Sequence, residues 1–116
     1  MAVDVAADIV KDLLAHGAEV GVETKALLPA AAHRGSLQIV KFLTKSVGVD
    51  PNVRGRQGMT ALIFASRRGK LDVVELLLED ESLDVDIADD AGKTAIDYAR
   101  ANGKEEIVQL LTSKAA

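Results

Sequence analysis

The chain has 116 residues, a formal net charge of −4, no cysteine and 48% apolar residues, of which only Phe42, Phe64 and Tyr98 are aromatic. This length supports one domain, and an apolar complement of Ala, Leu, Ile and Val is typical of closely packed helices. The absence of cysteine excludes disulfides and thiolate chemistry, and no run of about 18 apolar residues could form a membrane span. We therefore expect an all-α domain in the cytoplasm, with the nucleus as the alternative.

The first predicted helix lies within residues 1–20, where Ile9-Val10 and Leu13-Leu14 place two apolar pairs on one face of a helical period. The same pattern returns at Ile39, Val73 and Ile107, which are evenly spaced, whereas the step from Ile9 to Ile39 is shorter. We interpret residues 1–20 as half of a repeat that lacks its partner helix. Its exposed edge is expected to fray or to be covered in a homodimer.

The next unit, residues 21–54, departs most from the others. We predict that its first helix begins near Leu28, because Pro29 is tolerated in the first helical turn, where its missing N–H would be unpaired in any case. Thr24 and Ala26 take the positions where later units have a turn glycine and a capping threonine, so this helix is expected to lack its usual cap.

Two further units follow at residues 55–88 and 89–116. Each contains a segment that opens with threonine and closes with glycine, Thr60–Gly69 and Thr94–Gly103, and the two segments have the same spacing as the apolar pairs. We predict that each segment is a short helix whose threonine hydroxyl caps the first turn. Gly58 and Gly92, each shortly before its threonine, suit the positive φ of a tight turn. Apolar pairs after the closing glycines predict a second amphipathic helix in each unit.

This unit of a turn, a short helix, a glycine break and a second helix resembles the ankyrin repeat, whose pattern is approximately D-x-x-G-x-T-P-L-H-x-A-A-x-x-G-H-x-x-V-V-x-x-L-L-x-x-G-A-D. The resemblance covers nearly the whole chain. It implies an all-α solenoid of about three and a half stacked repeats, divided as residues 1–20, 21–54, 55–88 and 89–116.

The chain also departs from the family pattern in two respects. The family's histidine, which braces neighbouring turns, is replaced by Pro29, Ile63 and Asp97, so its hydrogen-bond ladder is expected to be missing. The linkers Val47–Asn52 and Glu79–Asp86 are each one residue longer than the family norm, and the second lacks the capping glycine.

No residue pattern supports catalysis. His16 and His33 lie beside glycines at helix ends without a metal-binding spacing, which favours surface or capping roles. The acidic run that begins at Asp84 lacks the glycine and glutamate of a calcium loop. Phe64 and Tyr98 share a column beside alanines, which favours interior packing over an aromatic binding ladder. We expect no enzymatic activity, cofactor or metal.

Charge is segregated along the chain. Residues 33–70 hold eight Lys or Arg and one acid, a net charge of +7, whereas residues 71–97 hold ten acids and one Lys, a net charge of −9. In ankyrin stacks the turn tips and the first helices form a concave face. The predicted partner-binding residues on that face are Arg34, Arg54, Arg56, Gln57, Met59, Arg67, Arg68, Asp90, Lys93 and Asn102.

Arginine forms bidentate contacts with carboxylates and is enriched at interfaces, so we predict a protein partner that is acidic at the contact. Simple solvent cover is the alternative role of these arginines. The predicted function is a protein-binding module, either a small regulator or part of a larger protein. An engineered scaffold without a natural partner is the alternative, which the irregular first connection and Pro29 argue against. Nucleic-acid binding would need stacking aromatics or a basic overall charge, and neither is present.

Overall fold

A computed structural model describes the backbone of residues 22–115 and the side chains of residues 27–114. The half repeat predicted over residues 1–20, with His16 and the predicted dimer edge, lies outside the described residues. The described helices are α2 (Val22–Arg34), α3 (Leu37–Lys41), the π-helical segment η1 (Phe42–Val47), the 3₁₀ turn η2 (Arg56–Gly58), α4 (Ala61–Arg68), α5 (Leu71–Leu78), α6 (Ala95–Ala101) and α7 (Glu105–Ala115).

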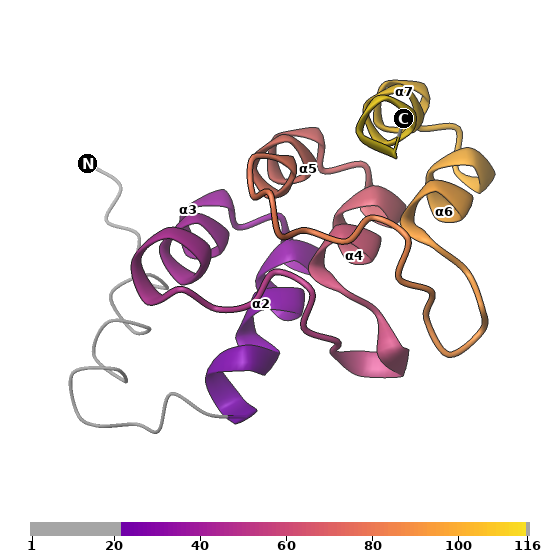
Figure 1. The fold of residues 1–116 in the computed structure, drawn as a ribbon. Helices are drawn as coiled ribbons and strands as arrows, with labels where there is room; N and C mark the ends of the chain where they lie inside the picture. The colour runs from indigo at the N-terminus through magenta and orange to yellow at the C-terminus, as the bar shows by residue number, and fades with distance from the viewer. Residues whose placement is uncertain (1–21, 116) are drawn as a thin grey trace.

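The helices stack in two layers (Figure 1). An inner layer holds α2, α4 and α6, which pack on one another in that order, and an outer layer holds α3, α5 and α7. Each inner helix is followed by an outer one, and the hairpins that precede α4 and α6 extend on the side of the inner layer away from the outer one. Residues 22–115 form no strand beyond an isolated bridge between Arg54 and Thr60, so the all-α prediction is confirmed for this part of the chain.

Local hydrogen bonds explain where α4 and α6 begin. The Thr60 hydroxyl accepts from the backbone N–H of Ile63 at 3.3 Å, which confirms the predicted cap of α4. At the start of α6, the Asp97 carboxylate accepts from both the backbone N–H and the hydroxyl of Thr94, at 2.9 and 3.1 Å. Asp97 therefore serves its own repeat and does not replace the histidine that braces neighbouring repeats.

The predicted start of α2 near Leu28 is wrong. The helix begins at Val22, and Pro29 lies inside it, where its ring removes one intrahelical hydrogen bond. The ring is buried, and a Cβ added to Gly55 would lie only 2.8 Å from the Pro29 Cβ. Packing of the proline ring against the next hairpin offsets the local cost, and this tertiary contact is invisible to a rule about helix propensity.

The lengthened linkers are accommodated in two ways. After α3 the chain continues as π-helical η1, a form that typically absorbs an extra residue, and ends at Gly48 with a φ of 80°. After α5 the helix stops instead, and Asp80 accepts from the backbone N–H and hydroxyl of Ser82 at 2.9 and 2.7 Å. This turn takes the place of the missing glycine cap. The Asn52 amide then joins the two linkers, because its nitrogen donates to the Ser82 carbonyl at 2.8 Å.

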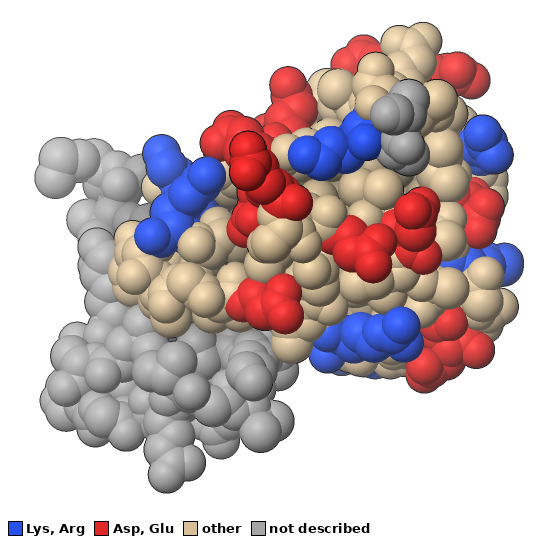
Figure 2. Space-filling view, viewed as in Figure 1, with Lys and Arg blue, Asp and Glu red and all other residues tan. Residues whose placement is uncertain are grey.

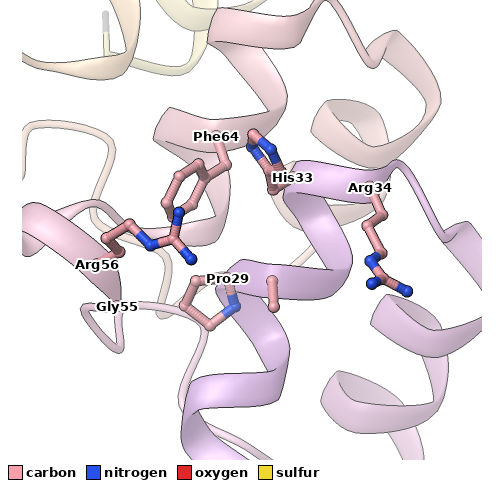
Figure 3. Close-up of a pocket in the computed structure, with 7 residues that line it drawn as sticks. Pro29, His33, Arg34, Gly55, Arg56 and Phe64 are labelled. Atoms are coloured by element: carbon pink, nitrogen blue, oxygen red, sulfur yellow. The ribbon is translucent and has the colours of Figure 1, made fainter.

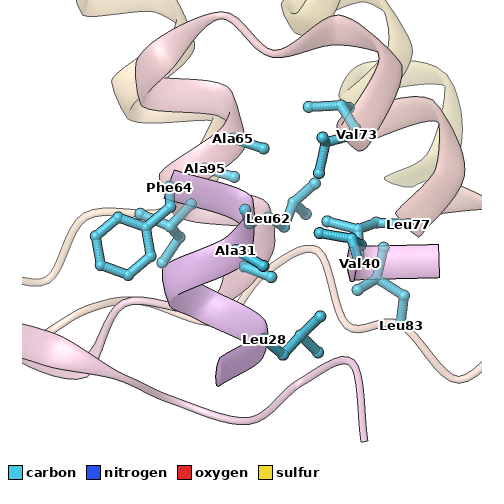
Figure 4. Close-up of a cluster of buried hydrophobic side chains, with 14 of the residues drawn as sticks. Leu28, Ala31, Val40, Leu62, Phe64, Ala65, Val73, Leu77, Leu83 and Ala95 are labelled. Atoms are coloured by element: carbon cyan, nitrogen blue, oxygen red, sulfur yellow. The ribbon is translucent and has the colours of Figure 1, made fainter. Parts of the chain in front are cut away.

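The core runs continuously between the two layers (Figure 4). Alanines on the inner helices let their backbones approach closely, and branched side chains from the outer helices fill the remaining space. Buried members include Leu28, Ala31, Val40, Leu62, Phe64, Ala65, Val73, Leu77 and Ala95. Phe64 lies in this core, as predicted, whereas Tyr98 is half-buried at its edge. Ser66 is also fully buried (0% exposed), and its hydroxyl has no hydrogen-bond partner within the described structure.

Candidate functional site

Two hairpins at equivalent places in successive repeats are closed by the same pair of backbone hydrogen bonds. In the first, the N–H of Gly55 donates to the Met59 carbonyl at 2.8 Å, and the N–H of Gly58 donates to the Gly55 carbonyl at 3.1 Å. In the second, the N–H of Asp89 donates to the Lys93 carbonyl at 2.9 Å, and that of Gly92 donates to the Asp89 carbonyl at 2.9 Å. The two closing hydrogen bonds are therefore the same, but the tips differ, because Gln57 has a φ of 58° and the Met59 N–H donates to the Arg56 carbonyl at 3.0 Å, whereas the Lys93 N–H donates to the Asp89 carboxylate.

In the second hairpin a carboxylate fills the turn. Asp89 is only 6% exposed and accepts from the backbone N–H groups of Ala91 and Lys93, at 2.9 and 3.0 Å, and from the Tyr98 hydroxyl. Burial by itself raises the pKa of Asp89, but these hydrogen bonds and the charge of Lys93 bring the pKa below its usual value. The carboxylate therefore stays ionised and holds the turn together.

In the first hairpin both members of this pair are absent, because Gly55 replaces the aspartate and Phe64 replaces the tyrosine. Pro29 packs where a side chain at position 55 would begin. What remains is a pocket of about 460 Å³ between α2 and the hairpin, shown in Figure 3. We call it the Gly55 pocket, and it is lined by Pro29, Ala30, His33, Arg34, Gly55, Arg56 and Phe64.

His33 connects this pocket to a group of arginines. Its ring meets Phe64 edge to face with centroids 5.2 Å apart, and its Nδ1 atom is buried without a hydrogen-bond partner in the described structure. Burial lowers the pKa of His33, and so, in decreasing order, do the positive charges of Arg68, Arg67, Arg56 and Arg34. The sequence assigned His33 a surface or capping role, and the structure shows a half-buried histidine facing a cationic environment.

The positive charges of four of the predicted arginines therefore act on His33, although these residues come from different elements. Arg34 lies at the end of α2, Arg67 and Arg68 at the end of α4, and Arg56 in the first hairpin. All four side chains are exposed, and none forms an ion pair within the described part of the chain. Cations in the last turn of a helix are favoured by the helix dipole, which helps α2 and α4 carry three of them. Figure 3 shows Arg56 and Arg34 on opposite sides of α2, with the Arg56 side chain directed towards Pro29.

The remaining predicted residues lie around this group. Arg54 is exposed on the hairpin stem and does not line the Gly55 pocket. The Gln57 carbonyl accepts from the Asp90 N–H at 3.0 Å, which joins the two hairpin tips. The Asn102 amide donates to the Arg67 carbonyl at 3.3 Å. Lys93 and Arg67 both lie near the Tyr98 ring, at 5.8 and 5.9 Å from its centroid.

The prediction that Met59 offers its side chain to a partner is wrong. Met59 is only 5% exposed and belongs to the core. It precedes the capping Thr60, and an apolar residue at this position typically packs against the fourth residue of the helix, here Phe64. Lys93 occupies the same position in the next repeat, where its ammonium group lies over the ring of Tyr98. In the sequence, the signal for the burial of Met59 was the pair of apolar residues Met59 and Phe64 on either side of the capping Thr60.

Another part of the surface is rich in acidic residues. Figure 2 shows acidic side chains spread over one side of the molecule, between α5 and the hairpin that precedes α6. The exposed acids in this stretch are Glu79, Glu81, Asp84, Asp86 and Asp90. Across residues 22–115 no three acidic or histidine side chains come together in a way that could hold a metal, and no helix is long and apolar enough to cross a membrane.

Comparison with known proteins agrees with this architecture. A family profile described as ankyrin repeats (3 copies) matches residues 1–89 and 27–116, which together span the chain. A search of curated proteins finds no match. Among 288 matching chains of solved structures, one belongs to the complex of the Bd0816 predatory endopeptidase from Bdellovibrio bacteriovorus with immunity protein Bd3460. The TM-score is 0.69 and the sequence identity is 31%. The match covers 77% of the present chain and 46% of the chain in that complex, so the present chain spans less than half of the length of the chain it matches.

Proposed function

The chain belongs to the ankyrin repeat family, whose members generally bind proteins, and we propose that it is a non-enzymatic module that binds an acidic protein. The binding surface is the inner face, which we define as the exposed side of α2, α4 and α6 together with residues 54–58 and 90–93. The observation that carries the proposal is the group of Arg34, Arg56, Arg67 and Arg68, whose charges converge on His33 without an internal ion pair among the described residues.

Such a group is suited to bind an external anion. A guanidinium group is always charged, and its planar donors match a carboxylate bidentately, so an acidic surface would satisfy donors that the described residues leave open. Arg54, Gln57, Asp90, Lys93 and Asn102 stay predicted contacts at the edge of this group. The exposed acids outside the inner face, Glu79, Glu81, Asp84 and Asp86, would repel an acidic partner and so help to orient its approach.

A second candidate is a module that binds and holds a peptidase. It is favoured by one observation, the 31% identical chain in the complex between an endopeptidase and an immunity protein. Ankyrin repeats share their core and turn residues whatever they bind, so this identity supports the fold more strongly than the partner. Recovery of a peptidase, together with loss of its activity when the chain is added, would favour this candidate.

The proposal is tested by identifying the partner and then reversing two arginines. Proteins retained by the immobilised chain are identified by mass spectrometry, and the affinity of each is measured by calorimetry. Changing Arg67→Glu and Arg68→Glu together should weaken binding by about thirtyfold, the loss of about 2 kcal/mol expected for a central arginine anchor. The association rate should also become less sensitive to salt.

A matched control changes the same number of charges on the outer layer. Lys41→Glu with Lys45→Glu alters the net charge equally, so it measures the effect of overall charge together with the loss of the exposed ion pair between Lys45 and Glu79. The Arg67 and Arg68 changes should cost less than about 1 kcal/mol of stability, because both residues are exposed and Arg67 loses only a weak contact with the Tyr98 ring. Equal binding by the two double variants would refute the inner face as the site. Absence of any specific protein partner would favour the alternative of a scaffold without a natural ligand.

A further inference from the structure

The Gly55 pocket lies beside the hairpin position that holds a carboxylate in the next repeat. In that repeat the Asp89 side chain occupies the turn and accepts a hydrogen bond from Tyr98. In the first hairpin Gly55 and Phe64 supply neither the carboxylate nor the hydroxyl, although the same backbone hydrogen bonds close the hairpin. The two substitutions remove both partners of a single hydrogen bond.

The chain cannot fill this space from position 55. A Cβ there would meet the Pro29 ring at 2.8 and 3.0 Å, so Pro29 closes the route by which a side chain would enter from the hairpin. The pocket still measures about 460 Å³, opens to solvent, and carries no acidic residue in its lining. Among the described residues no carboxylate lines the pocket, so we look to another molecule for the entering group.

The chemistry of the lining selects an anion on an apolar stem. Arg34 and Arg56 supply positive charge at the rim, and His33 supplies a buried ring nitrogen that has no partner in the described structure. Pro29, Ala30 and Phe64 supply apolar walls. An aspartate or glutamate side chain combines a carboxylate with methylene groups, and it repeats the group that the equivalent turn already holds at Asp89.

We infer that the Gly55 pocket receives a carboxylate side chain from the partner protein, with Arg56 and His33 as its contacts. This assignment rests on the proposed function, and it adds the specific group that is recognised and its position. The inserted carboxylate would be held by these side chains, because the Met59 N–H of this turn already donates to the Arg56 carbonyl at 3.0 Å. It would also offset the positive charges of Arg34, Arg56, Arg67 and Arg68 that act on His33.

The test uses small probes and the intact chain, so no partner needs to be known. N-acetyl-glutamate amide is titrated at low ionic strength, with N-acetyl-glutamine amide as the neutral probe of the same shape, while NMR follows the His33 and Phe64 rings. The glutamate probe should cause saturable shifts with a dissociation constant on the order of 1 mM, as expected for a ligand of about a dozen heavy atoms. The pKa of His33 should rise when this probe is bound, because a nearby negative charge favours the protonated ring.

Two variants locate the binding. Arg56→Gln should weaken the glutamate probe about tenfold, whereas Lys41→Gln on the outer layer removes the same charge and should leave binding unchanged. A triple variant, Pro29→Ala with Gly55→Asp and Phe64→Tyr, rebuilds the internal carboxylate pair and should abolish binding. If this variant does not fold, Arg56→Gln and the His33 pKa still decide the matter.

Four results would overturn the inference. Equal shifts with the glutamate and glutamine probes would show that charge is not recognised. An unchanged affinity in Arg56→Gln, or in a folded triple variant, would place the probe elsewhere. Tighter binding of inorganic phosphate than of the glutamate probe would assign the pocket to a different anion. If a protein partner depends on Arg67 and Arg68 but not on Arg56, the binding module stands and the pocket assignment fails.

Discussion

Replacing Asp89 by alanine should destabilise the fold more than replacing any other acidic residue in the described part of the chain by alanine. The substitution removes the carboxylate that accepts hydrogen bonds from the backbone N–H groups of Ala91 and Lys93 and from the Tyr98 hydroxyl. Bonds to a buried charged group are worth about 1.5–3 kcal/mol each, but Ala91 and Lys93 are exposed, so water can replace part of what is lost. We therefore expect about 1 kcal/mol per bond and a total loss of about 3 kcal/mol.

The assay is urea denaturation followed by far-UV circular dichroism, with the same denaturant slope expected for both proteins. The midpoint of thermal unfolding should fall by about 10 °C or more. Tyr98→Phe removes only one of the three bonds and should cost about 1 kcal/mol, and adding it to Asp89→Ala should cost almost nothing more. Asp90→Ala is the matched control, because its side chain is exposed and its hydrogen bond to Gln57 uses the backbone. A loss in Asp89→Ala no larger than that in Asp90→Ala would refute this account.

The remaining predictions concern the ionisation of Asp89, the buried hydroxyl of Ser66 and the ionisation of His33. The pKa of Asp89 is lower in the folded state than in the unfolded chain. The stabilisation of the fold by the ionised carboxylate is therefore complete above the usual carboxyl pKa of 3.8 and is lost as the pH falls through the folded pKa. Acid titration of the wild-type protein and of Asp89→Ala would show this difference. Ser66→Ala should raise the free energy of unfolding by about 1 kcal/mol, since it removes an unpartnered buried hydroxyl and improves helix propensity; a loss in urea denaturation would contradict this. NMR titration should give His33 a pKa below 6.5, so the contribution of the neutral ring to stability is lost as the pH falls from about 6.5. Arg68→Ala should raise the pKa of His33. An unchanged pKa in this variant would show that Arg68 does not act on the ring.

Much of the fold could be predicted because the repeat imposes the same local rules three times. Thr60 and Thr94 mark helix starts, and the apolar pairs mark the buried faces of the outer helices, since capping and helical periodicity depend on near neighbours in sequence. Pro29 shows where this fails. Its position inside α2 depends on packing against Gly55, which belongs to the hairpin of the next repeat and is no neighbour in sequence.

The candidate site was only partly predictable for the same reason. The sequence placed Arg34, Arg56, Arg67 and Arg68 on one face, because the family geometry places turn tips and inner helices there. It could not show that their charges converge on a half-buried His33, since burial depends on contacts between repeats. The loss of the carboxylate and of its hydroxyl partner could have been noticed by comparing the pair Gly55 and Phe64 with the pair Asp89 and Tyr98. Taken one position at a time, each substitution looks conservative or neutral.

The bonds between repeats also bear on how the chain emerges from a ribosome. In the described residues, the side-chain bonds that join one repeat to the next span only 30 to 36 positions, from Asn52 with Ser82 to Lys114 with Leu78. No bond of this kind has to wait for a distant part of the chain, because its partner is synthesised within about one repeat length. At about 5–20 residues per second, each added repeat supplies its contacts to the previous one within seconds of leaving the exit tunnel. Folding can therefore proceed from α2 towards α7 during synthesis, and little apolar surface is exposed for long.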